Sequence, residues 1–436
     1  MNKTFLYVLI FLTLVSFVIR IYRFTSPGKY YFDEVYHVVT AKAYSQNNPA
    51  AYDPFAPPPE QGTAYDWLHP PLAKLIQAGS IKVLGDNPVG WRLPSVIFGT
   101  AIIPLTFILA TLLFGPLVGL FAAAVISFEN LTFVMSRITM NDVFVVVFIL
   151  LSLIFAAFYA KASKSMHIIL SSIFLGLAIS SKWSGVYAIP LVFGYLSYIS
   201  FKKRRWDTKL LLTLLLPPLI YLLSYGQFWL QGHSVRQFID LHKQILWYQN
   251  RHDLVHSYGT TPIYCVPEGL GGQKSLCPWV FDARGVYFSY HEQGGKAEYI
   301  YALGNPLIFW AGFVASFFLI GRLVEKRDKQ SFSVNKQSFA SKKKLALVLA
   351  AYFIFWVPWI FSPRIMFLYH YLPAIPFLSI ALGIVLSDIY KTRRSYIAVF
   401  ALVAFALVFF YLYPISSGYP IEIKSIGRYM WFDSWR

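Results

Sequence analysis

Two adjacent carboxylates, Asp33 and Glu34, are the residues of this chain with the clearest potential for chemistry. They close the run 30–34, directly after the first hydrophobic segment. Carboxylates at such a place are costly unless they bind or react. We take Asp33 as a candidate general base and Glu34 as a residue that supports it or orients an acceptor. The alternative is that the pair only caps a helix.

The composition indicates a protein that crosses the membrane many times. Of its 436 residues, 57% are hydrophobic and 13% are charged, and the mean hydropathy is +0.52. This excludes a soluble domain, and the first segment reads as a retained anchor because no small-residue cleavage site follows it. The net charge of +18 does not indicate a nucleic-acid partner, because the basic residues gather in short loops, as in cytoplasmic loops of membrane proteins.

Eleven hydrophobic segments are long enough to cross a bilayer, which takes roughly 20 apolar residues each. The predicted spans are 5–23, 91–114, 117–136, 141–160, 166–182, 185–201, 209–230, 303–321, 345–361, 365–387 and 396–413. Alternation along the chain places the following basic residues on the same side as the N-terminus: Lys161, Lys164, Lys202, Lys203, Arg204, Arg205, Lys326, Arg327, Lys329, Lys342, Lys343, Lys344, Lys391, Arg393 and Arg394. That side is then cytoplasmic. The loops 24–90 and 231–302 and the C-terminal tail 414–436 face outward.

The first outer loop contains two short helical patterns. Residues 33–46 have apolar side chains at helical spacing, and 70–84 begin with prolines, which the first turn of a helix tolerates. Both are too short and too polar to span, so we expect helices in the outer interface. Residues 53–66 between them are rich in Pro and Gly and should form an irregular linker or lid.

The polar residues of the spans gather at their outer ends. These candidates for binding a substrate are Arg92, Arg137, Asp142, Lys182 and Arg364. Any single cation could be an anchor whose charge reaches the membrane surface, and Asp142 could pair with Arg137 or cap a helix. The histidines of loop 231–302 have no strong metal-ligand spacing, so we expect no metal.

Cations and carboxylates that gather at the outer ends of the spans favour the transfer of a sugar from a lipid-linked phosphate donor. Guanidinium groups match phosphate oxygens, so Arg92, Arg137, Lys182 and Arg364 are candidates for binding the phosphate and sugar of a lipid-linked donor. Asp142 would position sugar or acceptor. The leaving phosphate needs cations but no general acid, whereas the attacking hydroxyl needs a base. A single carboxylate, Asp33, could supply that base.

In their order and placement these residues resemble the protein O-mannosyltransferases of the GT-C class of membrane glycosyltransferases. The resemblance covers nearly the whole chain. It rests on the acidic pair, on a His-Pro-Pro-Leu element, on an arginine opening the second span, on an acidic residue opening the fourth, on a Lys-Trp-Ser-Gly element and on three C-terminal motifs. The matching residues are Asp33-Glu34, 69–72, Arg92, Asp142, 182–185, 277–284, 302–306 and 364–373.

The resemblance implies an all-α polytopic GT-C fold, with about eleven transmembrane helices and interfacial helices in the first outer loop. It implies transfer of mannose from a polyprenyl-phosphate donor to Ser/Thr hydroxyls of secreted or membrane proteins, with inversion, at the extracytoplasmic face and without a cofactor. His69, Trp183 and Arg284 join the substrate-binding candidates. Residues 231–302 are too short for the β-rich domain of eukaryotic members, which indicates a bacterial or archaeal type. We expect a catalytic module at 1–302 and a four-span module at 303–436.

Two other functions remain open. A relative of the same class could transfer a polyprenyl-linked sugar to a lipid or cell-wall glycan. A transporter of lipid-linked sugars is a different class, but transporters often show internal repeats and midplane polar sites, and neither is found in this sequence. The only cysteines, Cys265 and Cys277, share one outer loop, where a disulfide or two free thiols are both possible. We predict the disulfide.

Overall fold

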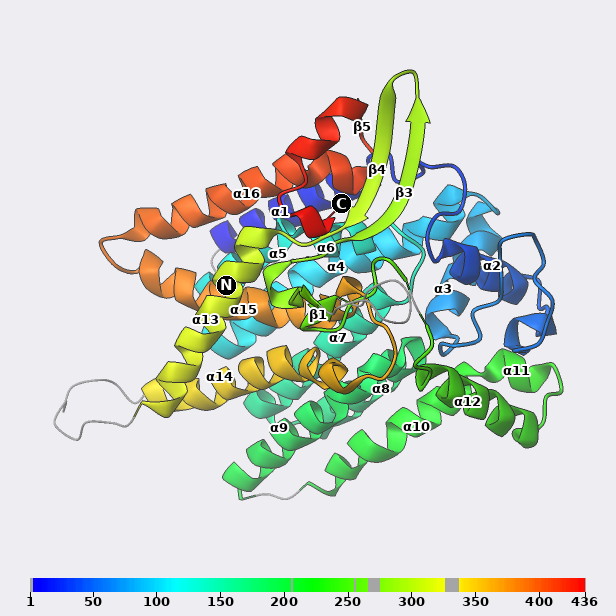
Figure 1. The fold of residues 1–436 in the computed structure, drawn as a ribbon. Coiled ribbons are helices and arrows are strands. Elements are labelled where there is room, and N and C mark those ends of the chain that lie inside the picture. The colour runs from blue at the N-terminus through cyan, green and yellow to red at the C-terminus, as the bar shows by residue number, and fades with distance from the viewer. Residues whose placement is uncertain (1–2, 205–206, 255, 266–274, 326–336, 436) are drawn as a thin grey trace.

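Helices dominate the computed structural model (Figure 1), which describes all residues except 1–2, 205–206, 255, 266–274, 326–336 and 436. Within the described residues, eight helical segments are long and apolar enough to cross a membrane, and three shorter apolar helices accompany them. Each coincides with one of the eleven predicted spans. Of the basic loop residues, Arg205, Lys326, Arg327 and Lys329 lie outside the described part of the chain.

The long apolar segments begin with α1 (Lys3–Ile21), α4 (Pro88–Phe114) and α7 (Asp142–Ala162). The others are η2 with α9 (Trp183–Tyr187, Ala188–Lys202), α13 (Pro306–Val324), α14 with η5 (Gln337–Ile354, Val357–Phe361), η6 with α15 (Leu368–Ala374, Ile375–Tyr390) and α16 (Ser395–Ser417). The shorter ones are α5 (Pro116–Ser127), α8 (Ser165–Ser181) and η3 with α10 (Thr208–Leu211, Leu212–Ser224). The closest helix packing runs as a series of pairs through the bundle, with α8 on α7, α7 on α4, α4 on α5 and α5 on α15.

Two predicted spans are interrupted. The segment predicted at 117–136 consists of α5 and α6 (Asn130–Met135), because the buried carboxylate of Glu129 accepts hydrogen bonds from the backbone N–H groups of Leu131 and Thr132 and starts a new helix. The segment predicted at 209–230 consists of α10 and α11 (Gly226–Leu230). The prediction missed these breaks because both segments are apolar over most of their length, and the polar residues inside them, such as Glu129 and Gln227, were taken as parts of a span.

The two helices expected in the first outer loop are present as α2 (Glu34–Ser45) and α3 (Leu72–Leu84). They pack against each other, and α3 also packs on α4. A short η1 turn (Pro49–Tyr52) and an irregular linker join them. Their buried side chains form a hydrophobic cluster with α11 and α12 (Val235–Gln249), which fixes the first outer loop against the second.

A small antiparallel sheet was not predicted. Strands β3 (Val286–Gln293) and β4 (Lys296–Ala302) form a hairpin, and β5 (Pro420–Glu422) from the C-terminal tail adds a third strand. Gly294 and Gly295 make the turn with φ of +59° and +73°, as a two-residue hairpin turn requires. Alternating aromatic residues on both sides of this Gly-Gly pair were the signal that could have revealed it. Three further short helical turns are η4 (Trp279–Phe281), η7 (Ile423–Arg428) and η8 (Asp433–Trp435).

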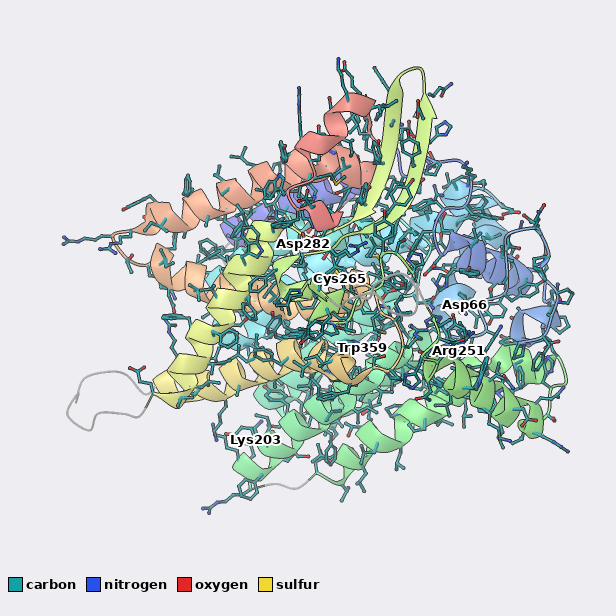
Figure 2. All side chains as sticks on the ribbon, viewed as in Figure 1. Asp66, Lys203, Arg251, Cys265, Asp282 and Trp359 are labelled. Carbon is teal, nitrogen blue, oxygen red and sulfur yellow. A yellow bond between two sulfur atoms is a disulfide. The ribbon has the colours of Figure 1, made fainter. Side chains whose placement is uncertain are left out.

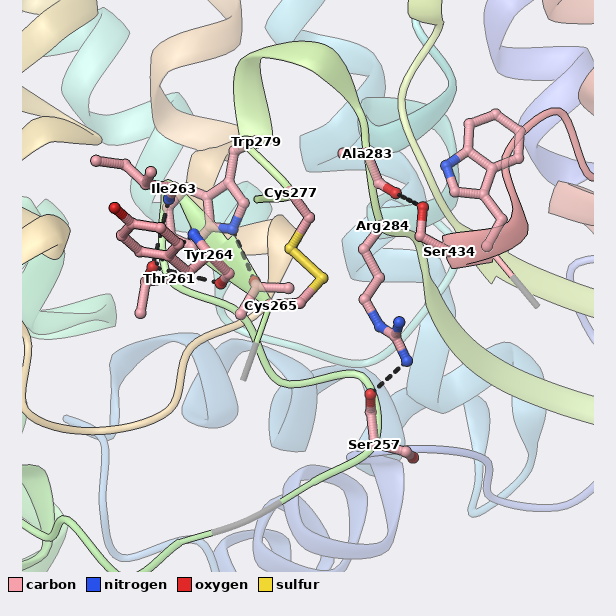
Figure 3. Close-up of a disulfide and its surroundings, with 12 residues drawn as sticks. Ser257, Thr261, Ile263, Tyr264, Cys265, Cys277, Trp279, Ala283, Arg284 and Ser434 are labelled. Atoms are coloured by element: carbon pink, nitrogen blue, oxygen red, sulfur yellow. Dashed lines mark hydrogen bonds between the residues drawn. A yellow bond between two sulfur atoms is a disulfide. The ribbon is translucent and has the colours of Figure 1, made fainter. Parts of the chain in front are cut away.

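The predicted disulfide between Cys265 and Cys277 is formed, with a Cα–Cα distance of 5.4 Å (Figure 3). It joins the end of β1 (Tyr264–Cys265) to the residue that directly follows its antiparallel partner β2 (Ser275–Leu276). The same loop carries Thr260, which exchanges two backbone hydrogen bonds with Met366, of 2.7 and 2.9 Å. The disulfide-linked loop is thereby attached to the segment that contains Arg364.

Candidate active site

A polar cavity of about 400 Å³ lies between the first outer loop and the helix ends beside it. Its charged and titratable lining residues are Asp33, His37, Asp66, His69, Asp142, Lys182, His256, Arg364 and His370, and Tyr36, Tyr65, Tyr248 and Tyr369 add hydroxyl groups. Of the ten residues that the sequence proposed for the site, Asp33, His69, Asp142, Lys182 and Arg364 line this cavity. Segments from both halves of the chain contribute to it.

Asp33 stands at the start of α2, but it does not cap that helix through its side chain. Its carboxylate accepts a long hydrogen bond of 3.4 Å from the Tyr369 hydroxyl and otherwise faces the cavity. Phe32, just before it, has a φ of +48°, a backbone conformation that is unusual for an aromatic residue, and its ring stacks on Phe288 at 4.1 Å. This packing holds the strained turn that presents Asp33.

Burial raises the pKa of Asp33 to about 6, and the nearby imidazole of His37 opposes this shift. Asp66 and Asp142 add to the increase through repulsion, while Lys182 reduces it. A carboxylate with such a pKa is ionised at neutral pH and is a stronger base than an ordinary aspartate.

Glu34 is fully buried and does not line the cavity. Arg92 donates to both of its carboxylate oxygens, at 2.8 and 2.7 Å, and the backbone N–H of Thr139 donates to it at 3.0 Å. The rest of the Arg92 guanidinium donates to the backbone carbonyls of Phe24, Pro27 and Lys29. The structure thus places Arg92, proposed as a phosphate ligand, in a buried pair that fastens the loop carrying Asp33.

A second polar network centres on Asp66, which the sequence analysis did not select. Its carboxylate lies 2.9 Å from Nζ of Lys74, 2.9 Å from Nδ1 of His69 and 3.0 Å from Nδ1 of His37. Burial alone would raise the pKa of Asp66, but His69, Lys74 and His37 hold it well below its usual value. The network ties the irregular linker to α2 and α3 at the cavity wall. Among its members, the sequence analysis selected only His69, through the His-Pro-Pro-Leu element.

Asp142 and Lys182 form a buried ion pair of 2.7 Å at the floor of the cavity. One carboxylate oxygen of Asp142 has no hydrogen-bond partner within the described structure. The Lys182 ammonium also lies 5.5 Å from the centre of the Tyr369 ring. An unsatisfied buried oxygen beside a cavity is suited to accept a hydrogen bond from a sugar or acceptor hydroxyl.

Next to the polar cavity lies a larger and mostly apolar groove of about 670 Å³. Trp183, Tyr187, Pro217, Trp359 and Phe361 are among its lining residues. Residues common to the groove and the polar cavity are Leu68, His69, Lys182, Arg364 and His370. An apolar groove that opens on cationic side chains fits a lipid chain with a phosphate at its head.

Arg364 stands at this junction and has no carboxylate partner among the described residues. Its guanidinium lies 5.7 Å from the centre of the Tyr248 ring. Among the cations at the junction, Arg364 is therefore the one most available to bind an anion.

Trp183, another of the proposed substrate-binding residues, lines the groove. Its indole N–H donates a hydrogen bond of 3.0 Å to the Tyr221 hydroxyl.

Two other proposed residues lie elsewhere. Arg137 donates to the backbone carbonyls of Ser417 and Tyr22, at 3.0 Å each, and Arg284 donates to the carbonyl of Ser257 (Figure 3). Both act as internal braces, and neither lines the cavity or the groove. Within the described residues, no group of three His, Cys, Asp or Glu side chains could hold a metal ion.

The structure has the fold of the GT-C membrane glycosyltransferases. The yeast protein O-mannosyltransferase Pmt1-Pmt2 complex bound to the sugar donor matches with a TM-score of 0.80, at 15% sequence identity, over 99% of this chain and 93% of that one. ArnT from Cupriavidus metallidurans bound to undecaprenyl phosphate matches with a TM-score of 0.55, at 13% identity, over 99% and 76% of the two chains.

Sequence comparison gives the family. Residues 10–230 match the model of the dolichyl-phosphate-mannose-protein mannosyltransferases, and residues 234–435 match the C-terminal four-span region of protein O-mannosyltransferases. The chain therefore belongs to the protein O-mannosyltransferase family. A relative from Mycobacterium tuberculosis, a polyprenol-phosphate-mannose–protein mannosyltransferase, is 23% identical over 85% of this chain and 81% of its own length.

Proposed function

We propose that this protein transfers mannose from a polyprenyl-phosphate donor to Ser or Thr hydroxyls of acceptor proteins, at the extracytoplasmic face and with inversion. The observation that carries the proposal is the junction of the apolar groove with the polar cavity, where Arg364, Lys182 and His69 border both. The groove would hold the polyprenyl chain, the junction the phosphate, and the polar cavity the sugar and the acceptor.

In the proposed reaction, the hydroxyl oxygen of the acceptor attacks the anomeric carbon of the mannose. Asp33 takes the proton from this hydroxyl as the new bond forms. The bond from that carbon to the phosphate oxygen breaks on the opposite side, which inverts the configuration. The released polyprenyl phosphate keeps the electron pair, and Arg364 and Lys182 stabilise its charge. Asp142 orients Lys182 and accepts a hydrogen bond from the sugar or the acceptor. Glu34 and Arg92 act indirectly, by holding the turn before Asp33.

The test of this function is transfer by the purified protein reconstituted in sealed proteoliposomes. Polyprenyl-phosphate-mannose is supplied with a Ser/Thr peptide in one arm and with lipid or glycan acceptors in another, and products are identified by mass spectrometry. A mannosylated peptide with an α-linkage from a β-linked donor supports the proposal. Transfer to the lipid or glycan acceptor alone would establish the related cell-wall activity instead, and movement of the intact donor across the bilayer without transfer would establish a transporter.

The rate should depend on pH through Asp33. Only the ionised carboxylate accepts a proton, so kcat/KM for the peptide should rise as the pH increases through about 6 and level off above it. At one pH unit below that value, roughly a tenth of the protein would hold Asp33 ionised. The measurement is peptide transfer between pH 5 and 8, after confirming that the protein stays folded throughout. A flat profile over that range would contradict the role of Asp33 as the base.

Arg364 should act mainly on the donor. Replacing Arg364 with Ala removes a charged partner of the phosphate, so KM for the lipid donor should rise about 10- to 100-fold, with a smaller change in KM for the peptide. Arg364→Lys should restore little, because an ammonium group does not reproduce a two-pronged guanidinium contact. Arg236→Ala on α12, at an exposed position outside both cavities, is the matched control. An unchanged donor KM in Arg364→Ala would mean that Arg364 is only an anchor.

A further inference from the structure

A separate basic cavity of about 320 Å³ lies at the other end of the helix bundle from the active site. It is formed by the C-terminal ends of α7 and α9 and the beginning of α14. Figure 2 shows how far apart the two ends are, with Lys203 at the end of α9 and Asp66 in the active-site region on opposite sides of the molecule. The basic cavity shares no lining residue with the polar cavity or the apolar groove.

Four lysines line this cavity, and none of its lining residues is acidic. They are Lys161, Lys202, Lys343 and Lys344. Lys343 donates to the Tyr198 hydroxyl, and Lys344 donates to the Leu113 carbonyl at the end of α4. The side chains of Lys161 and Lys202 have no hydrogen bond or ion pair with any described residue, although both lie close enough to repel Lys344. The cavity therefore concentrates positive charge without an internal counterion.

The neighbouring Lys203 shows the ordinary role of a lysine at such a place. Its ammonium donates to the backbone carbonyl of Ala160 at 2.9 Å and to the Ser163 hydroxyl, so it caps the end of α7. It does not line the cavity. Helix capping accounts for Lys203. The excess of lysine in cytoplasmic loops accounts for the presence of Lys161 and Lys202, but not for their gathering around one cavity.

The rest of the lining is apolar or aromatic, with Leu112, Ala157, Ile199 and Tyr195. Since α4, α7 and α9 are membrane spans that end here, the cavity lies where the hydrocarbon meets the aqueous phase. The lysines lie at the exposed mouth of the cavity, and the apolar side chains lie deeper along the spans. A phospholipid has the same order, with its phosphate at the membrane surface and its acyl chains in the hydrocarbon. Basic pockets between transmembrane helices are known to suit anionic headgroups.

We propose that this cavity binds the headgroup of an anionic phospholipid of the surrounding bilayer. The phosphate would lie among Lys161, Lys202 and Lys343, and the first part of an acyl chain would contact Leu112 and Ile199. The bound lipid would join α14, from the C-terminal module, to α7 and α9, from the N-terminal module, and so stabilise the packing of the two halves. The site takes no part in sugar transfer, so it does not depend on the proposed reaction.

Native mass spectrometry of the purified full-length protein tests the site, with phosphatidylglycerol and phosphatidylcholine as probes. The test variant is the triple change Lys161→Gln, Lys202→Gln and Lys343→Gln. The control is Lys391→Gln, Arg393→Gln and Arg394→Gln, which removes the same charge from another loop outside the cavity. Each lysine near an anionic surface contributes about 1 kcal/mol, so phosphatidylglycerol retention should fall at least about tenfold in the test variant only.

Thermal stability gives the second measurement. Added phosphatidylglycerol should raise the unfolding temperature of the wild type and of the control, but not of the test variant. Equal loss of retention in both variants would assign the effect to general surface charge and overturn the proposal. The proposal would also be overturned if the wild type retained phosphatidylcholine as well as phosphatidylglycerol. The same holds if it preferred polyprenyl phosphate or inorganic phosphate to phosphatidylglycerol in this assay.

Discussion

Replacing Asp33 with Asn should abolish most of the transfer activity and leave the protein folded in the membrane. An acceptor hydroxyl has a very high pKa and must lose its proton as the new bond forms, and an amide of nearly the same shape cannot take it. General-base catalysis is typically worth about 10²–10⁴ in rate, so the loss should be of that size. The structure removes the competing explanation, because the Asp33 side chain makes no capping hydrogen bond that Asn would preserve.

The comparison needs a carboxylate that is changed in the same way outside the site. Asp240 on α12 is exposed and, among the residues that the structure describes, pairs only with Lys243, so Asp240→Asn should transfer mannose at the wild-type rate. Peptide transfer is measured for both variants at matched amounts of folded protein. Asp33→Asn should keep the wild-type unfolding temperature and the wild-type donor affinity. If it transferred within a fewfold of the wild-type rate, the mechanism proposed here would be wrong.

The sequence predicted much of this architecture because membranes impose simple rules. Apolar segments of spanning length gave the eleven spans, and helical spacing gave α2 and α3. The position of Asp33 after the first span and of Lys182 and Arg364 at span ends correctly predicted that all three meet at one cavity, although the same reasoning wrongly placed Arg92 and Arg137 there. Such residues are conspicuous, because charge at a span end requires an explanation.

What the sequence could not supply was the pairing of charges. Arg92 and Glu34 are separated by 58 positions, and no local pattern indicates that the guanidinium and the carboxylate bury each other. Asp66 lies in a Pro- and Gly-rich linker without periodicity, so its contacts with His69 and Lys74 become visible only in three dimensions. Arg137 shows the same limit, since its partners are backbone carbonyls.

The buried pair leads to the second large effect, on stability. Replacing Arg92 with Ala would leave the Glu34 carboxylate buried without its partner and three backbone carbonyls without their donor. Removing one member of a buried ion pair typically costs about 3–5 kcal/mol, so we expect a much lower unfolding temperature and little folded protein in the membrane. Transfer activity should fall with the folded fraction, while KM for the donor in the surviving protein should stay near the wild-type value.

Arg23 offers a matched control in the same loop region. It pairs with Glu298 at 2.6 Å, but this pair is partly exposed, so Arg23→Ala should cost less than about 1 kcal/mol. The measurements are the unfolding temperature and the donor KM of Arg92→Ala, Arg23→Ala and the double variant Arg92→Met with Glu34→Met. Removing both charges should recover part of the stability, because no unpaired ion is left buried. A stable Arg92→Ala protein with a strongly raised donor KM would instead place Arg92 at the phosphate, as its sequence position first indicated.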